Sequence, residues 1–500
     1  MSEPTLKCRH TGQDVPYQIH QGLAPMYVFQ LNEQWDAEKR QILRQLMADV
    51  PAAADDPNVL FDQLPAYGLT DFHWSWLDKA FAFRSDDYHW FFLSAQGRIQ
   101  ATCVIYHPKE SRLDGERIFY IDYVASAYWN RDRPNYVKQF GSVSRILIAH
   151  ASHFAINQLG YRPGFCLHSL PTAEGYYRYL GMIEYDADAD KENLRYFEAP
   201  PDIAGKLAGR LSMSDSPEGL PGDFEVYPSS RDAAVEFTAA LSSLKKALKP
   251  ADAKTHARPG EAYDDFIIRL ALNATNNKAV LYRKNDSAEE TKIQAWLSLI
   301  NEKSKFAVLS RRMPDFQGLS AQHLRQIALL SLKPENITSL VDVLAESYGV
   351  LLVVEPGFKS MKMDGCTFKL SQGTPVVGIA LRYNRYDNFW FTLMHELAHI
   401  HMHYDYLDNP ILDDLEEDND SDREVEANII AKDSLVSRQY WRTAWNARAN
   451  KKQLLDICAK AEVHPSIMAG MIRHQAKNYK LYPELHHSMD VKSAFGFAND

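Results

Sequence analysis

Residues 391–400 read FTLMHELAHI and place His395 and His399 four positions apart, with Glu396 directly after the first histidine. In a helix, side chains four residues apart share one face, so both imidazoles point the same way. Two neutral imidazoles so placed can bind Zn²⁺ at adjacent tetrahedral positions, and a neighbouring glutamate can reach a water at the metal. We therefore expect a zinc site on a helix, with His395 and His399 as ligands and Glu396 as the catalytic base.

Apolar residues around this motif predict that the helix is buried. Leu393, Leu397 and Ile400 recur at helical spacing and would pack into a core. The short motif also occurs by chance on buried helices, so a purely structural helix is the alternative. A third ligand elsewhere in the sequence would favour the metal.

A tetrahedral catalytic zinc site needs a third protein ligand and one open position. Two candidates follow the motif directly. Asp405 stands where the extended metzincin motif keeps a histidine, but the turn glycine of that motif is Met402 here. His403 lies one turn beyond His399, where a straight helix carries it away from the metal.

A third candidate lies in residues 422–431, DREVEANIIA. Glu424 and Asn428 share one face of this predicted helix, together with alanines that allow a second helix to approach closely. We favour Glu424 as the zinc ligand and expect Asn428 to hydrogen-bond a ligand from behind. Glu426 points to roughly the opposite face. A solvated acidic helix start, which the helix dipole stabilises, is the alternative.

Residues before the zinc helix predict a small sheet. Residues 350–354 predict a buried strand that follows a helix at about 334–348. Residues 363–369 and 374–381 predict a hairpin that turns at 371–373. The zinc helix would follow this hairpin.

Four ordered motifs resemble a known family. They are LRY at 381–383, FWFT at 389–392, HExxH at 395–399 and ExxAN at 424–428. Over roughly residues 319–474 this order resembles the ImmA/IrrE-type zinc metallopeptidases, in the branch that also contains antitoxin-like regulators. The helix-turn-helix module with which that branch often begins is missing here.

The resemblance implies a zincin-like domain with a small sheet, an HExxH helix and a helical tail. It also implies limited proteolysis of a regulatory protein, for example a helix-turn-helix repressor or a toxin–antitoxin partner, in a stress response. An antitoxin-like binding protein with a non-catalytic zinc site is the alternative from another functional class.

The N-terminal half alternates predicted strands and helices. Strands at 90–93 and 101–106 form a hairpin, a strand at 117–124 follows, and a helix is expected from about 143 to 159. This order resembles a GNAT-type acyltransferase domain over about residues 15–200. The resemblance implies binding of acetyl-CoA or another acyl-CoA, and a third functional alternative, N-acetyl transfer.

The resemblance also implies site residues for that cofactor. Residues 138–143, KQFGSV, take the place of the pyrophosphate loop [Q/R]-x-x-G-x-[G/A]. Gly141 matches it strictly, whereas Lys138 replaces Gln or Arg and Val143 replaces a small residue. Tyr177 matches the family tyrosine that acts as general acid to the thiolate, and a core tyrosine is the alternative.

Composition predicts an α+β protein of several domains. We expect a GNAT-like mixed α/β domain at 1–208, a Ser/Pro/Gly/Asp-rich linker at 209–223, a helical connecting region at 224–318 and the metallopeptidase domain with its helical tail at 319–500. The N-terminal domain would act as a sensor that gates the peptidase.

Charge and cysteine usage limit the partners and the compartment. The chain has 500 residues, 45% of them hydrophobic, and a formal net charge of −10, which argues against broad nucleic-acid binding. Its five cysteines are scattered without a C-x-x-C pair, which suits a reducing compartment. Because residues 1–19 carry no apolar signal core and no run reaches a membrane span, we expect a soluble cytoplasmic protein. The sequence indicates no oligomeric state.

Overall fold

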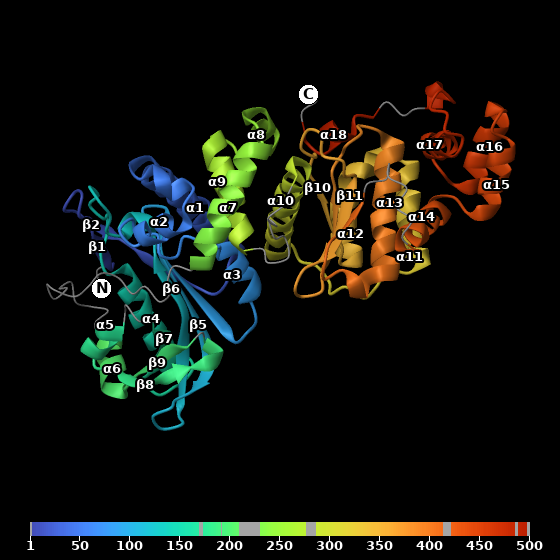
Figure 1. Cartoon of the computed structure of the whole chain (residues 1–500). Coiled ribbons are helices and arrows are strands. Elements are labelled where there is room, and N and C mark those ends of the chain that lie inside the picture. The colour runs from blue at the N-terminus through green and yellow to red at the C-terminus, as the bar shows by residue number, and fades with distance from the viewer. Residues whose placement is uncertain are drawn as a thin grey trace. The chain divides into compact units, whose positions relative to one another are not determined.

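The computed structural model describes residues 3–169, 174–191, 193–209, 231–276, 287–413, 422–485 and 489–497. Residue contacts divide the chain into two compact units, shown in Figure 1. Unit 1 contains residues 1–242 and 261–278, and unit 2 contains residues 243–260 and 279–500. Both units combine helices with a sheet, which confirms the predicted mixed α and β class.

The two units differ from the four parts expected from composition. The region predicted as a helical connection, 224–318, is shared between the units, whose boundary falls within α7 (Arg231–Ala247). Of the predicted linker at 209–223, only Gly209 lies within the described residues, where it ends α6 (Pro201–Gly209). The four-part division therefore stays a prediction.

Unit 1 is built on a seven-stranded sheet in the order β3-β4-β5-β6-β7-β9-β8. All neighbouring strands are antiparallel except β6 and β7, which are parallel. The strands are β3 (Gln18–Gln21), β4 (Tyr88–Ala95), β5 (Arg98–Glu110), β6 (Arg117–Ser126), β7 (Phe165–Ser169), β8 (Ile183–Asp188) and β9 (Leu194–Ala199). A separate hairpin joins β1 (Thr5–Lys7) to β2 (Asp14–Pro16).

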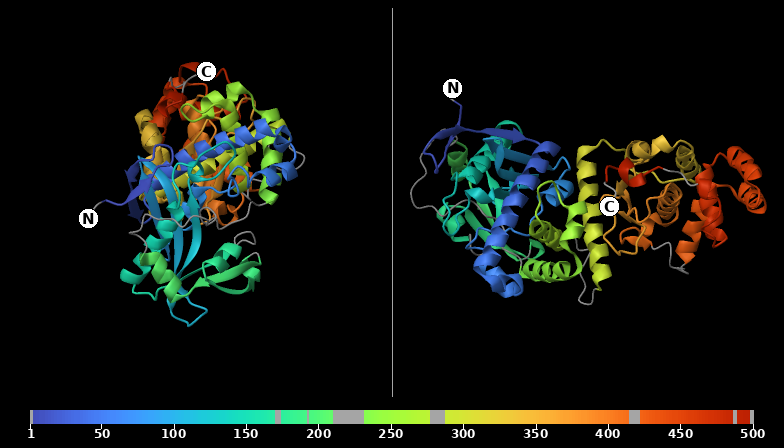
Figure 2. Two further views of the ribbon diagram at one scale, coloured as in Figure 1. Left: turned by 90° about the vertical axis from the view of Figure 1, so that its left-hand side faces the viewer. Right: turned by 90° about the horizontal axis from the view of Figure 1, so that it is seen from above.

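Helix α4 (Val143–Asn157) packs on one face of this sheet. It has apolar residues at helical spacing, and Val143, Leu147 and Phe154 join the core formed by alternate residues of β4 to β7. Unit 1 also contains α6, most of α7, and the helices α1 (Pro25–Asp49), α2 (Pro57–Gln63), α3 (Trp76–Ala82), α5 (Glu174–Tyr179) and α9 (Tyr263–Asn276). The long strands β5 and β6 end in a hairpin that projects as a blue-green loop in both Figure 1 and Figure 2.

Unit 2 contains a four-stranded sheet in the order β10-β12-β11-β13. Its strands are β10 (Leu351–Val354), β11 (Gly365–Lys369), β12 (Pro375–Ile379) and β13 (Ile411–Asp413). β10 and β12 are parallel, and the other two pairs are antiparallel. The predicted hairpin is confirmed as β11 and β12, with Gly373 at positive φ in the turn.

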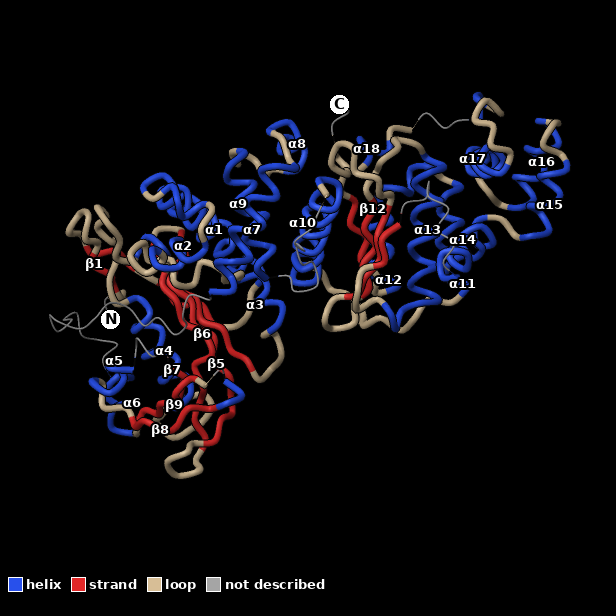
Figure 3. Tube along the Cα trace, viewed as in Figure 1, coloured by secondary structure: helices blue, strands red, loops and turns tan. Residues whose placement is uncertain are grey.

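Helices surround this short sheet, as Figure 3 shows in blue and red. Helix α13 (Tyr386–His403) contains the HExxH motif, and α14 (Asp422–Leu435) packs beside it. The other α-helices assigned to unit 2 are α8 (Pro250–His256), α10 (Ala288–Ser310), α11 (Ala321–Leu329), α12 (Leu340–Tyr348), α15 (Arg438–Asn446), α16 (Lys451–Ala461), α17 (Pro465–Gln475) and α18 (Val491–Ala494). In the part of the chain that the structure describes, no helix combines the length and apolar character needed to cross a lipid bilayer.

Candidate metal centre

The helix that carries the motif is fixed by its core-facing residues. Leu393, Leu397 and Ile400 of α13 are all buried in the core of unit 2, as their spacing predicts. His395 and His399 are fully buried as well. A buried pair of imidazoles needs polar partners, because burial removes the water that would otherwise solvate the ring nitrogens.

The start of α13 is held by a charged contact with α17. Asp387, in the first turn, accepts a hydrogen bond from the Arg473 guanidinium at 2.9 Å and another from Arg385 at 2.5 Å. A Cβ atom at Gly470 would lie 2.3 Å from Asp387 Oδ2, so α17 approaches this carboxylate very closely. The carboxylate also lies at the helix end where negative charge is favourable.

Three side chains converge on one point beside α13. The Nε2 atoms of His395 and His399 lie 3.1 Å apart. Glu424 of α14 reaches them with Oε2 at 3.2 Å from His395 Nε2 and Oε1 at 3.4 Å from His399 Nε2. The structure thus brings together the three residues that the sequence analysis favoured as ligands.

The donor set fits a zinc ion. Tetrahedral bonds of 2.0–2.1 Å place neighbouring ligand atoms about 3.3 Å apart. The separation of the two imidazole nitrogens, 3.1 Å, and the separations of 3.2 and 3.4 Å from them to the two carboxylate oxygens of Glu424 lie close to this value. Two imidazoles and one carboxylate are also the ligand types of catalytic zinc sites that keep a fourth position open.

Helix α14 can place Glu424 close to α13 because small residues line the face of α14 that packs against α13. Ala427 and Ala431 are fully buried, and the Glu424 side chain is only 12% exposed. Asn428 lies one turn after Glu424 and is partly exposed. Among the described residues its side chain has no hydrogen-bond partner, so its role behind a ligand stays a prediction.

The carboxylate of Glu396 is held on the sheet side of α13. Thr367 of β11 donates a hydrogen bond from Oγ1 to Glu396 Oε2 at 2.6 Å. A Cβ atom at Gly365 would lie 2.1 Å from Glu396 Oε1, so the carboxylate lies against bare backbone. Sequence reasoning missed both partners, although a glycine within a strand indicates close approach by another group.

His403 and Glu426 form a second layer that sequence reasoning discarded. His403 is buried, and its Nδ1 lies 3.1 Å from Nδ1 of His399. Its Nε2 lies 3.3 Å from Oε2 of Glu426. Among the described residues His403 does not join the three converging ligands, in line with the prediction that the helix carries it away from the metal. Its ring instead contacts His399 on the side away from the ligands.

The part of the chain that forms this centre matches a known protein family. Residues 345–471 match the model of the Peptidase_M78 family, described as the IrrE N-terminal-like domain. The match includes both helices and the hairpin, and it confirms the resemblance found in the four ordered motifs. A comparison with curated proteins finds no match.

A comparison with solved structures finds a CoA-dependent acyl-homoserine lactone synthase, BjaI, with SAM and isopentyl-CoA. The sequences are 12% identical, the similarity covers 44% of this chain and 99% of the synthase, and the TM-score is 0.24.

The phosphate loop predicted in unit 1 lies outside the IrrE-like domain. Lys138 is buried and forms an ion pair with Asp132 at 2.8 Å. A Cβ atom at Gly141 would lie 2.9 Å from Nη2 of Arg9, and Val143 is buried in the core. The loop therefore precedes α4 as expected, but the predicted lysine is engaged by a carboxylate.

Tyr177 also lies in unit 1, in the hydrophobic core. Its side chain is 1% exposed, and its ring centroid lies 5.5 Å from that of Phe197. A general acid must reach the leaving thiolate. The position thus favours the core tyrosine that the sequence analysis kept as the alternative.

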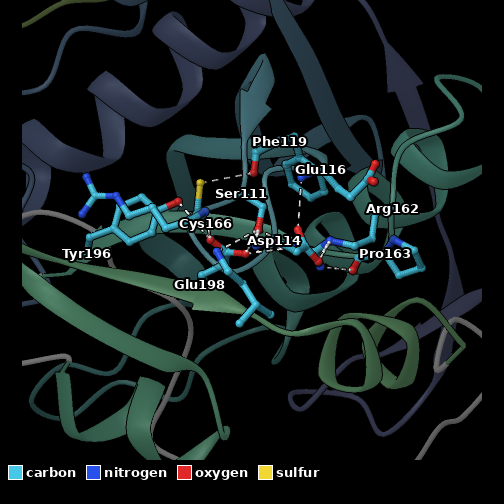
Figure 4. A network of polar contacts seen from close by, with 11 residues as sticks. Ser111, Asp114, Glu116, Phe119, Arg162, Pro163, Cys166, Tyr196 and Glu198 are labelled. Carbon is cyan, nitrogen blue, oxygen red and sulfur yellow. Dashed lines mark hydrogen bonds and ion pairs between the residues drawn. The ribbon is translucent and has the colours of Figure 1, made fainter.

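A buried polar cluster in unit 1 has a structural role (Figure 4). Glu198 of β9 is fully buried and accepts hydrogen bonds from the Ser111 hydroxyl, from Arg112 N at 2.8 Å and from Arg162 Nη2 at 2.9 Å. These contacts compensate the buried charge. They fix the β5–β6 hairpin to β9.

Proposed function

We propose that the chain is a zinc-dependent endopeptidase that cleaves a regulatory protein at a limited number of sites. The observation that carries the proposal is the convergence of His395, His399 and Glu424. Glu396 follows His395 in the sequence, and its carboxylate accepts a hydrogen bond from Thr367. The match of residues 345–471 to a peptidase family supports it.

His395, His399 and Glu424 would hold the metal. When bound, Zn²⁺ supplies a Lewis acid that polarises the scissile carbonyl and lowers the pKa of a water molecule. Glu396 would then accept the proton of the attacking water and donate it to the leaving amine. The hydrogen bond from Thr367 at 2.6 Å orients the carboxylate for both transfers.

The substrate class and the control of cleavage extend this proposal. The substrate would be a regulatory protein such as a helix-turn-helix repressor or a toxin–antitoxin partner. Unit 1 would be the sensor, and an acyl-CoA is the ligand to test, because a loop with Gly141 leads into α4 and helix N-termini favour phosphate. Failure of acetyl-CoA and longer acyl-CoAs to raise the melting temperature of the full-length protein would remove this ligand class.

The test of proteolysis compares protein amino-termini in host cells that express wild type or Glu396→Gln. The variant keeps the shape of the side chain but has no carboxylate to accept a proton. A new amino-terminus seen only with wild type, under stress or without it, would establish cleavage and name the substrate.

Identical amino-termini under every condition, with zinc bound to both proteins, would contradict the peptidase proposal. The antitoxin-like binding protein would then take its place. Acetyl transfer that survives Glu396→Gln would instead place the activity in unit 1.

A further inference from the structure

Three polar side chains form a continuous chain behind the metal ligands. His399 presents Nε2 to the point where the three ligands meet and Nδ1 to the opposite side. There Nδ1 lies 3.1 Å from His403 Nδ1, and His403 Nε2 lies 3.3 Å from Glu426 Oε2. Two contacts at hydrogen-bond distance therefore link His399 to His403 and His403 to Glu426, and we call these three side chains the relay.

Only one arrangement of protons is compatible with a metal on this site. An imidazole that binds a cation through Nε2 carries its proton on Nδ1. That proton must be donated to His403 Nδ1, which then has to accept it and carries its own proton on Nε2. The second proton is donated to Glu426, whose carboxylate can only accept.

The geometry of the two helices makes this relay possible. His403 follows His399 by four residues, so their rings are neighbours on α13. Glu426 comes from the first turns of α14, two residues after the ligand Glu424. The same contact between α13 and α14 that delivers the third ligand thus also delivers the carboxylate at the end of the relay.

We propose that His403 and Glu426 are positioning residues that hold His399 in the tautomer and orientation required for zinc binding. This proposal rests on the proposed zinc site and adds its outer layer. Partners of this type orient metal-binding histidines and raise their basicity, and losing one lowers metal affinity by about 10–100-fold.

His403 should contribute more to zinc affinity than Glu426, and Glu426 should contribute only through its contact with His403. His403 is buried and contacts His399 directly, whereas the Glu426 side chain is 54% exposed, so water can partly replace it. Glu426 acts only through His403. Once His403 is removed, loss of Glu426 should cost no further affinity.

The experiment measures the zinc affinity of full-length protein by competition with a chromophoric chelator. We expect His403→Ala to weaken zinc binding by about 10–100-fold and Glu426→Ala to weaken it by a smaller factor in the same direction. The double variant should match His403→Ala. His403→Gln, whose amide oxygen can accept the His399 proton, should recover part of the affinity.

Two matched controls lie on the same helices. His401→Ala removes an imidazole from α13 that contacts the Leu319 carbonyl, and Asp433→Ala removes a carboxylate from α14 that pairs with Arg438. Both should keep the wild-type affinity. Circular dichroism and melting of the zinc-free proteins establish that each variant is folded.

The outcomes separate this inference from the proposed function. If wild type itself binds no zinc, the proposed function fails. If wild type binds zinc and the zinc affinity of folded His403→Ala lies within about twofold of the wild-type value, the positioning role is overturned. Should His403→Ala not fold, Glu426→Ala decides, and an unchanged affinity there overturns the proposal.

Discussion

The carboxylate of Glu396 occupies the space that a side chain at position 365 would need. A Cβ atom on Gly365 would lie 2.1 Å from Oε1 and 2.8 Å from Cδ of Glu396. The backbone of β11 therefore forms one wall of the site. Any larger residue at this position has to displace the proposed base.

Gly365→Ala should reduce cleavage without removing zinc. The added methyl group pushes the Glu396 carboxylate away from its place, and a displacement of about 1 Å can cost about 100-fold in rate. We expect kcat/KM to fall by about that factor. The proposed zinc ligands are untouched, so metal analysis should find the wild-type zinc content.

A neighbouring glycine provides the control for this variant. Gly378 pairs with Cys366 in the same hairpin, and a Cβ atom there would lie 2.7 Å from Cys366 Sγ. Gly378→Ala should lower the melting temperature but keep the activity of each folded molecule. Equal losses of specific activity in the two variants would contradict a role for the Gly365–Glu396 contact.

Thr367→Val should also slow cleavage, because it removes the hydroxyl that orients Glu396 but keeps the shape of the side chain. A hydrogen bond to a charged group contributes about 1.5–3 kcal/mol. We therefore expect kcat/KM to fall by about 10–100-fold, with zinc affinity unchanged. Thr367→Ser retains the hydroxyl and should stay active, and a valine variant as active as the serine variant would speak against this role.

Metal removal should destabilise the protein through Glu424. A ligand that binds only the folded state raises the melting temperature, so a chelator should lower that of wild type. Glu424→Ala should melt at the same temperature with and without zinc. Asp422→Ala, in the exposed first turn of the same helix, should keep the zinc response. A zinc-dependent shift that persists in Glu424→Ala would exclude this residue as a ligand.

The ion pair of Asp71 and Arg131 in unit 1 should make stability depend on pH. Arg131 binds the carboxylate through two nitrogens, at 2.5 and 2.8 Å, and both side chains are buried. Burial alone would raise the pKa of Asp71, but the charge and hydrogen bonds of Arg131 hold it below the usual range. Because the folded-state pKa is depressed, this stabilisation is fully present above the unfolded pKa of about 3.9 and is lost as the pH falls through the folded pKa.

Asp71→Asn should therefore destabilise unit 1 at pH 7 by about 3–5 kcal/mol, since it leaves a buried guanidinium without its counter-charge. The difference from wild type should shrink as the pH falls below about 4. Urea unfolding followed by tryptophan fluorescence measures both. The Asp132 side chain pairs with Lys138 but is 74% exposed, so Asp132→Asn should lower the free energy of unfolding by at most about 1 kcal/mol. A cost for Asp71→Asn that does not change with pH would contradict this account.

Local pattern was enough to predict the elements of unit 2 that build the candidate site. The hairpin, the buried strand before it and the two helices of the site follow from periodicity and turn residues, which act over a few neighbours. In unit 1 the same reasoning placed the hairpin of β4 and β5 and the start of α4. It could not predict the surroundings of Lys138 and Tyr177, because their partners Asp132 and Phe197 depend on how the loops and strands pack.

Within the candidate site, the sequence by itself determined that His395 and His399 share a helix face, since the helical period alone places residues four apart together. Tertiary packing decided the rest. Glu424 reaches the histidines only because buried alanines let α14 lie against α13, and Thr367 reaches Glu396 only through the register of β11. His403 lies near enough in sequence to be considered, yet its role depends on the position of Glu426 on the other helix. Contacts between distant segments arise from burial of a shared core, which no local pattern encodes.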